Sequence, residues 1–220
     1  MPAAVIFDLD GVLLDSEPLW NGVKEALVRE TGGRWRAEAP HVMMGMSSPE
    51  WAAYLRDELG VPLAVAEINR QVVERMEAGY RRALPLLPGA AAAVRSLAAR
   101  WPLALASSSN RELIDLVLEL ADFGDAFRVT VSSEEVERGK PAPDVYLAAA
   151  HGLGVPAADC VAIEDSSNGL RAAVAAGMTV IAVPNPHYAP QPDALALAAA
   201  AVPVVGDVTP SLVELVASAR

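Results

Sequence analysis

The sequence predicts an α/β protein: a parallel β-sheet with helices on both faces, into which a small helical module is inserted. Three observations lead to this prediction. Short apolar runs of the kind that form buried parallel strands recur along the chain. Helical patterns lie between most of these runs, and this alternation is typical of parallel sheets. One long stretch after the first apolar run contains helical patterns only.

The apolar runs give the positions of the predicted strands. Strands are expected at Ala4–Phe7, Leu103–Ala106, Val129–Val131, Val161–Ile163 and Val180–Val183, with a shorter and weaker candidate at Val202–Val205. The helices between and after them are expected at Gly89–Ala99, Arg111–Leu120, Pro143–Ala150, Asn168–Ala176 and Ser211–Ala217. Proline and glycine residues at the ends of these segments support the limits.

The stretch without strands is interpreted as the inserted module. Its helical patterns cover Pro18–Glu30, Pro49–Leu59 and Ala64–Arg82. The predicted division is therefore a core of residues 1–14 and 85–220 with an inserted module of residues 15–84. The two connections, near Leu14–Glu17 and Leu84–Pro88, are expected to serve as hinges for the module.

Composition excludes several classes of function. The 220 residues, 53% of them hydrophobic, can form one core and a small extra module. A formal net charge of −11 argues against a nucleic-acid partner. No apolar run reaches membrane-spanning length, and the single cysteine, Cys160, cannot form an internal disulfide. We therefore expect a cytoplasmic protein without a membrane partner, and nothing in the sequence requires more than a monomer.

Polar residues follow four of the predicted strands. Asp8 and Asp10 come after the first strand, and the turn of residues 107–110 after the second. Lys140 lies in the loop after the third strand, and Glu164-Asp165 follow the fourth. Ligands of open parallel sheets bind beyond the carboxyl ends of the strands, so these groups are expected to form one site.

Four acids this close repel one another, so either some of them carry a proton or a cation lies among them. Oxygen ligands without histidine suit Mg²⁺, which also binds substrate phosphate oxygens. The Lys140 ammonium and the Ser107 hydroxyl would then hold a phosphate opposite the metal. Main-chain NH groups of the turn, including those at Ser108 and Asn110, would add donors because a helix begins there.

The two aspartates after the first strand are two positions apart, so in an extended segment they face the same side. Asp8, beside the metal and Lys140, is expected to stay ionised and attack phosphorus. Asp10, close to like charge, is expected to carry a proton and give it to the leaving oxygen. The covalent product would be an aspartyl phosphate, which water then releases.

Each of these segments also has a purely structural interpretation. Asp10-Gly11 would fit a turn after a strand, and a serine hydroxyl of the 107–109 run would fit a helix cap. Lys140 would fit a solvated loop, and Glu164-Asp165 would fit a helix N-terminus. That all four interpretations should hold together, in this order along the chain, is implausible.

The same residues resemble a known family. Asp8-Leu9-Asp10-Gly11-Val12, Ser107, Gly139-Lys140-Pro141 and Glu164-Asp165 resemble the motifs of the haloacid dehalogenase superfamily, and most closely its branch of β-phosphoglucomutase-like sugar-phosphate phosphatases. The resemblance implies a Rossmann-like core with a helical cap inserted after the first strand. It also implies Asp8 as nucleophile, Asp10 as general acid and base, and Ser107 and Lys140 as phosphate ligands. Mg²⁺ would be held by Asp8, the main-chain carbonyl of Asp10 and Asp165, with Glu164 close by.

The chain departs from the mutases of that branch. They have a histidine where this chain has Trp20, a lysine where it has Met44, and an arginine for the second phosphate where it has Ser48. A mutase must hold a second phosphate, so these substitutions favour hydrolysis. Dehalogenases lack the second aspartate and the metal, so Asp10 argues against that activity.

The sequence therefore predicts a Mg²⁺-dependent phosphatase that acts on a small phosphorylated metabolite, a sugar phosphate. Side chains of the inserted module would set the specificity, and the candidates are Glu17, Trp20, Met44 and Met46. One alternative is a phosphosugar mutase with an atypical cap. Another is a non-enzymatic phospho-receiver module, which uses a similar acid cluster, hydroxyl and lysine.

Overall fold

The computed structural model describes residues 1–44 and 46–219 and contains a six-stranded parallel sheet of order β3-β2-β1-β4-β5-β6. The strands are β1 (Ala4–Phe7), β2 (Leu103–Ser107), β3 (Phe127–Ser132), β4 (Cys160–Glu164), β5 (Thr179–Ala182) and β6 (Ala200–Ala201). β1 lies at the centre and pairs with β2 and β4. This order places the residues that follow β1, β2 and β4 side by side at one edge of the sheet.

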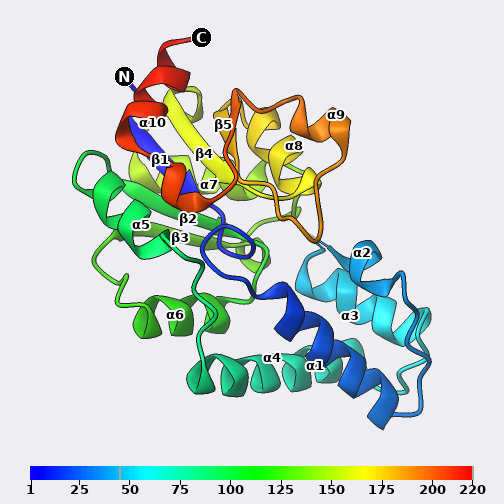
Figure 1. Cartoon of the computed structure of the whole chain (residues 1–220). Helices are drawn as coiled ribbons and strands as arrows, with labels where there is room; N and C mark the ends of the chain where they lie inside the picture. Colours follow the sequence, from blue (N-terminus) through cyan, green and yellow to red (C-terminus); the bar gives the residue numbers. More distant parts are fainter. Residues whose placement is uncertain (45, 220) are drawn as a thin grey trace.

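Helices cover both faces of the sheet (Figure 1). The core helices are α5 (Ala90–Ala98), α6 (Arg111–Leu120), α7 (Asp144–Leu153), α8 (Ser167–Ala175), α9 (Pro192–Leu195) and α10 (Pro210–Ser218). Alternate residues of β1 point to opposite faces. Val5 and Phe7 pack in one apolar cluster with α5, α6 and α10, and Ala4 and Ile6 pack in another with α7, α8 and α9. The strand that carries Asp8 is thus buried on both sides, which holds its end rigidly.

Four helices are inserted between β1 and α5, and Figure 1 shows them below the sheet domain. They are α1 (Glu17–Glu30), α2 (Ala39–Met43), α3 (Ser48–Asp57) and α4 (Val65–Arg82). A capping box begins α3, because the Glu50 carboxylate accepts a hydrogen bond of 2.8 Å from the Ser47 amide. The α/β class with a parallel sheet and a small helical insertion, predicted from the sequence, is therefore confirmed.

The two connections between the parts run side by side. Leu14 and Leu86 form an antiparallel bridge, and the Asp15 amide donates to the Pro85 carbonyl at 2.8 Å. The Leu87 amide donates to the Leu13 carbonyl at 2.9 Å. Both chain crossings therefore lie at one place, as a hinge requires. The limits of 15–84 for the inserted module stay a prediction, and this pairing supports them.

One predicted strand is wrong in position. Val202–Val205 was expected to be the sixth strand, but β6 is Ala200–Ala201 and only the Val202 amide still bonds to β5, through the Ala182 carbonyl at 2.9 Å. Pro203 has no amide hydrogen to continue the ladder, and a 3₁₀ helix begins at Val205. The valines suggested a strand, whereas the pairing falls on small alanines just before them.

Two further 3₁₀ helices lie at Ser133–Glu135 and Ala157–Asp159, and the third spans Val205–Asp207. The helices found within residues 1–44 and 46–219 are too short or too polar to cross a membrane.

Candidate functional site

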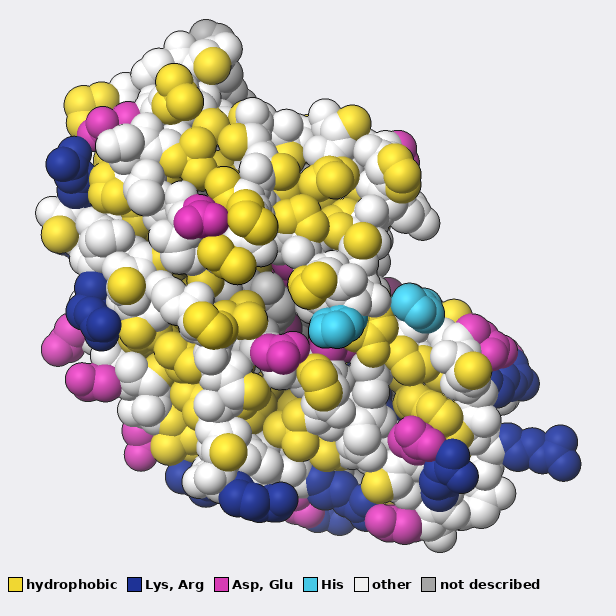
Figure 2. All heavy atoms as spheres, viewed as in Figure 1, with side chains coloured by type: hydrophobic (Ala, Val, Ile, Leu, Met, Phe, Trp, Pro, Cys, Tyr) yellow, Lys and Arg dark blue, Asp and Glu magenta, His cyan; other side chains and the backbone are white. Residues whose placement is uncertain are grey.

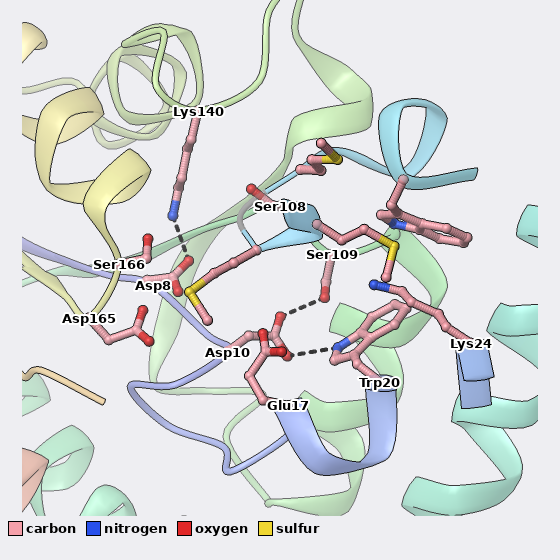
Figure 3. Close-up of a pocket in the computed structure, with 14 residues that line it drawn as sticks. Asp8, Asp10, Glu17, Trp20, Lys24, Ser108, Ser109, Lys140, Asp165 and Ser166 are labelled. Atoms are coloured by element: carbon pink, nitrogen blue, oxygen red, sulfur yellow. Dashed lines mark hydrogen bonds and ion pairs between the residues drawn. The ribbon is translucent and has the colours of Figure 1, made fainter. Parts of the chain in front are cut away.

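Most of the predicted site residues meet at the carboxyl edge of the sheet, where it faces the inserted module (Figure 3). Asp8 follows β1 directly, Ser108 follows β2 and Asp165 follows β4. Lys140 comes from the loop between β3 and α7. All four line one cavity, together with side chains of the inserted module. Parallel pairing of β1 with both neighbours produces this convergence, because all these strands end at the same edge.

Lys140 joins two of the buried acids. Its Nζ lies 2.6 Å from Asp8 Oδ1 and 2.6 Å from Glu164 Oε1. The lysine is buried, which acts to lower its pKa, but the charges of Asp8 and Glu164 outweigh this effect and raise the pKa. Lys140 is therefore a fixed ammonium directed at Asp8, and the solvated-loop interpretation does not apply.

Both carboxylate oxygens of Glu164 accept hydrogen bonds from neighbouring groups. Its Oε1 also accepts from the Tyr146 hydroxyl at 3.0 Å, and its Oε2 accepts from the amides of Asp165 and Ser166 at 2.8 and 2.9 Å. Burial alone would raise its pKa, but the charge of Lys140 and these donors lower it. These contacts make Glu164 the group that holds Lys140 in place.

Carboxylate oxygens of Asp8, Glu164 and Asp165 lie within 4.8 Å of one another, close enough to share one metal ion. Burial raises the pKa of Asp8 to about 8, partly offset by Lys140. Burial and the charges of Glu164 and Asp8 raise the pKa of Asp165 well above its usual range. A divalent cation would relieve this repulsion, so the donor set fits Mg²⁺.

The loop after β1 is shaped to admit the Asp165 carboxylate. Gly11 has a φ of +82°, and a Cβ at this position would collide with the Asp165 carboxyl oxygens. Only glycine combines this backbone conformation with the necessary space. Gly11, interpreted from the sequence as a turn residue, thus also makes room for a candidate metal ligand.

Asp10 accepts hydrogen bonds from three donors, which come from two segments of the chain. Its Oδ1 accepts from the Ser16 hydroxyl at 2.5 Å and from Trp20 Nε1 at 3.3 Å. Its Oδ2 accepts from the Ser109 hydroxyl at 2.6 Å. Figure 3 shows dashed lines from Asp10 to Ser109 and to Trp20, on the side of the cavity away from Lys140. Ser16 and Ser109 were not among the predicted site residues, and only the folded arrangement reveals their part.

The serines of the turn at residues 107–110 lie in different environments, which the sequence did not specify. Ser108 lines the cavity, and its buried hydroxyl has no hydrogen-bond partner within residues 1–44 and 46–219. Ser107 is buried behind it and accepts a hydrogen bond from the Ser109 amide at 3.0 Å. Helix α6 begins after Asn110, and no side-chain cap is found there among the residues that the structure describes. The prediction that one of these serines caps the helix is therefore wrong.

Asn110 makes contacts outside the cavity. Its Oδ1 accepts from the Ser48 hydroxyl at 2.9 Å, and its Nδ2 donates to Glu134 at 2.7 Å and to Asn69 at 3.2 Å. Neither Asn110 nor Ser107 belongs to the described residues that line the cavity. Their predicted roles as phosphate ligands stay predictions.

The inserted module forms the opposite wall. All four predicted specificity residues, Glu17, Trp20, Met44 and Met46, line the cavity, and so does Met43. Lys24 and Trp51 also line it, and the sequence analysis did not single these two out. The cavity measures about 70 Å³. Pockets for drug-sized ligands usually reach about 300 Å³ or more, so this arrangement suits a compact substrate.

Lys24 is the most informative of the missed residues. It is 7% exposed, and its Nζ lies 4.8 Å from the ring centre of Trp20 and 5.0 Å from that of Trp51. Burial lowers the pKa of Lys24 to about 8, although Glu17 and Asp10 act in the opposite direction. One signal was available in the sequence: lysine occurs at only two positions, 24 and 140.

Comparisons with known proteins agree with this geometry. The family model of haloacid dehalogenase-like hydrolases matches residues 2–177. Hexitol phosphatase B of Escherichia coli is 37% identical over 190 residues, which cover 84% of each chain. A probable pseudouridine-5'-phosphatase of Drosophila melanogaster is 36% identical over 189 residues, 83% of this chain and 81% of that protein. The crystal structure of CbbY from Rhodobacter sphaeroides in complex with phosphate superimposes with a TM-score of 0.84 at 27% identity, covering 97% of this chain and all of that one.

Proposed function

Because the chain belongs to the haloacid dehalogenase-like hydrolase family and is a phosphoric monoester hydrolase, we propose that it is a Mg²⁺-dependent sugar-phosphate phosphatase working through an aspartyl phosphate on Asp8. The observation that carries the proposal is the Asp8–Lys140 ion pair of 2.6 Å in the cavity that Asp10 and Asp165 also line. A carboxylate fixed by one ammonium and adjoining a metal-ligand cluster is suited to attack phosphorus.

In the first step an Asp8 carboxylate oxygen forms a bond to phosphorus while the bond from phosphorus to the substrate oxygen breaks. Asp10 gives its proton to that leaving oxygen, and the alcohol departs. In the second step Asp10 takes a proton from a water molecule, whose oxygen attacks the phosphorus. The Asp8–phosphate bond breaks, which restores the carboxylate and releases inorganic phosphate.

The remaining residues hold the reacting groups. Lys140 would pair with the transferring phosphoryl oxygens as well as with Asp8, and the unpartnered Ser108 hydroxyl would donate to the same group. Asp8, the Asp10 carbonyl and Asp165 would hold Mg²⁺, and Glu164 would keep Lys140 in position. When bound, the metal neutralises charge on the phosphoryl group.

The contacts of Ser48 argue against the mutase alternative. Its position is that of the arginine for the second phosphate, and here its hydroxyl bonds to Asn110 outside the cavity. The receiver alternative is set aside because the chain is a hydrolase. Incubation with a hexose 1-phosphate separates the remaining two possibilities, because a phosphatase releases inorganic phosphate and a mutase releases an isomer.

The nucleophile is tested with the variant Asp8→Asn. Purified protein with Mg²⁺ should hydrolyse an aryl phosphate, and both Asp8→Asn and EDTA should abolish that activity. Asp125→Asn, which removes an exposed carboxylate that does not line the cavity, serves as the matched control and should retain activity. Full turnover by Asp8→Asn would refute the assignment.

A further inference from the structure

Both lysines of the chain line the same cavity. The other fifteen basic residues are arginines, and the exposed cations in Figure 2 gather mainly along the outer surface of the inserted helices. Lys140 has two carboxylate partners at 2.6 Å. Lys24 has no carboxylate within 4 Å among the described parts of the chain, and its ammonium lies against two indole rings. A buried cation without an ion pair is costly, which indicates a task other than stability.

A packing role alone does not explain a lysine at this position. For stacking between two indoles, arginine is the better residue, because its guanidinium is planar and weakly hydrated. Lysine instead offers a compact ammonium with three donors. Figure 3 shows the Lys24 ammonium directed into the cavity, opposite the Asp8–Lys140 pair. It therefore lies where the end of a substrate remote from the phosphate would lie.

The charges around Lys24 indicate what that end carries. The carboxylates of Glu17 and Asp10 are close enough to stabilise the ammonium electrostatically, and Glu17 lines the same wall. A second phosphate or a carboxylate would therefore meet two acids as well as one cation. A neutral hydroxyl avoids this repulsion, because it can accept from Lys24 and donate to Glu17. The indole faces and the methionines can cover the carbon skeleton between them.

We propose that Lys24 is a specificity-determining residue, whose ammonium donates to a hydroxyl at the far end of a neutral polyol or sugar monophosphate while Glu17 accepts from it. This proposal rests on the phosphatase function proposed above and extends it to a substrate class. It predicts that substrates with a second anionic group are disfavoured.

The variant Lys24→Met tests the proposal, because methionine keeps the length of the side chain and removes the donors. The probes are sorbitol 6-phosphate, which has a hydroxylated far end, and p-nitrophenyl phosphate, which has none. We expect the ratio of kcat/KM for the polyol phosphate to that for the aryl phosphate to fall by about tenfold or more, as for the loss of a charged hydrogen bond. Lys24→Arg keeps a cationic donor and should restore part of the ratio.

Arg29→Met is the matched control. It removes one cation from the exposed side of the same helix, α1, and should leave the ratio unchanged. An unchanged ratio in Lys24→Met would overturn the proposal. A wild-type preference for fructose 1,6-bisphosphate or 2-phosphoglycolate over sorbitol 6-phosphate would also overturn it. Because p-nitrophenyl phosphate reports Asp8 chemistry separately, either result can be told apart from a failure of the phosphatase function.

A second measurement does not depend on the folding of Lys24→Met. The protein used is Asp8→Asn, which should not turn substrate over. Mass spectrometry follows the rate at which an amine-reactive acetylating reagent modifies Lys24. Lys24 is one of only two lysines, so the modified peptide is unambiguous. Sorbitol 6-phosphate should slow the acetylation of Lys24 several-fold more than inorganic phosphate does. Equal protection by the two probes would contradict a contact at the far end of the substrate.

Discussion

Replacement of Lys24 by methionine should make the protein more stable at neutral pH. Burial lowers the pKa of Lys24 from 10.5 to about 8, with Glu17 and Asp10 opposing the shift. A difference of one pKa unit corresponds to about 1.4 kcal/mol between the protonation states, so the buried ammonium costs about 3 kcal/mol at pH 7. Methionine also loses the attraction of the ammonium to the two indole rings, about 1–2 kcal/mol. The net gain in the free energy of unfolding should be about 1–2 kcal/mol.

The pH dependence gives the sharper test, since its sign is fixed. The pKa of Lys24 is lower in the folded protein than in the unfolded protein, so between about pH 8 and 10.5 the unfolded state binds more protons. The stability of the wild type therefore gains from rising pH in that window, and the variant has no such gain. The advantage of Lys24→Met should shrink by about 2 kcal/mol between pH 7 and pH 10.

The measurement is urea unfolding of both proteins at the two pH values. Indole fluorescence is a suitable probe, because Trp20 and Trp51 flank Lys24. With a slope of about 2 kcal/mol per molar urea, the midpoint at pH 7 should rise by about 0.5–1 M. Arg29→Met, an exposed position on the same helix, should shift stability by less than about 0.5 kcal/mol. A lower midpoint for Lys24→Met at pH 7, or a gap that does not change with pH, would refute the reasoning.

Three more predictions follow from the site. Glu164→Gln removes a carboxylate from the buried pair with Lys140, so thermal or urea unfolding should show a loss of about 3 kcal/mol, together with a lower kcat. Asp165→Asn should abolish Mg²⁺ binding in titration calorimetry, whereas retained binding would remove Asp165 from the metal site. Tyr188→Phe removes the 3.0 Å hydrogen bond that Asn21 of α1 donates to the Tyr188 hydroxyl of the core. Loss of this bond should favour opening of the inserted module by about 1 kcal/mol, seen as a higher KM and faster limited proteolysis at the hinge. Unchanged values would show that this bond does not hold the module closed.

Much of the core was predictable because its elements are decided locally. A run such as Ala4–Phe7 is apolar at every position, which is typical of a strand buried on both faces, and its limits agree with β1. The amphipathic pattern of Arg111–Leu120 likewise agrees with α6. The sixth strand was misplaced because edge pairing depends on which amides remain free, and Pro203 ends the ladder one residue after Val202. Short helices such as Ala39–Met43 contain too few residues to show a period.

The part of the candidate site at the carboxyl edge was predictable for a different reason: sheet topology brings the strand ends together whatever the conformation of the loops. Asp8, Lys140 and Asp165 meet as the parallel order requires. The wall formed by the inserted helices was harder to predict, because its lining residues depend on the rotation of each helix against its neighbours. Lys24 reaches the cavity only because α1 packs on α4 with that face inward, and one sequence does not specify that rotation.

Asp10 links the two parts of the site. Its hydrogen bond from Ser109 comes from the core, whereas those from Ser16 and Trp20 come from the start of the inserted module. Displacement of α1 would therefore remove donors from Asp10 and withdraw Lys24 from the cavity in the same movement. Under the roles proposed above for Lys24 and Asp10, recognition of the far end of a substrate and orientation of the acid would therefore depend on one helix. An enzyme built this way would align its acid when a bound substrate holds the module closed.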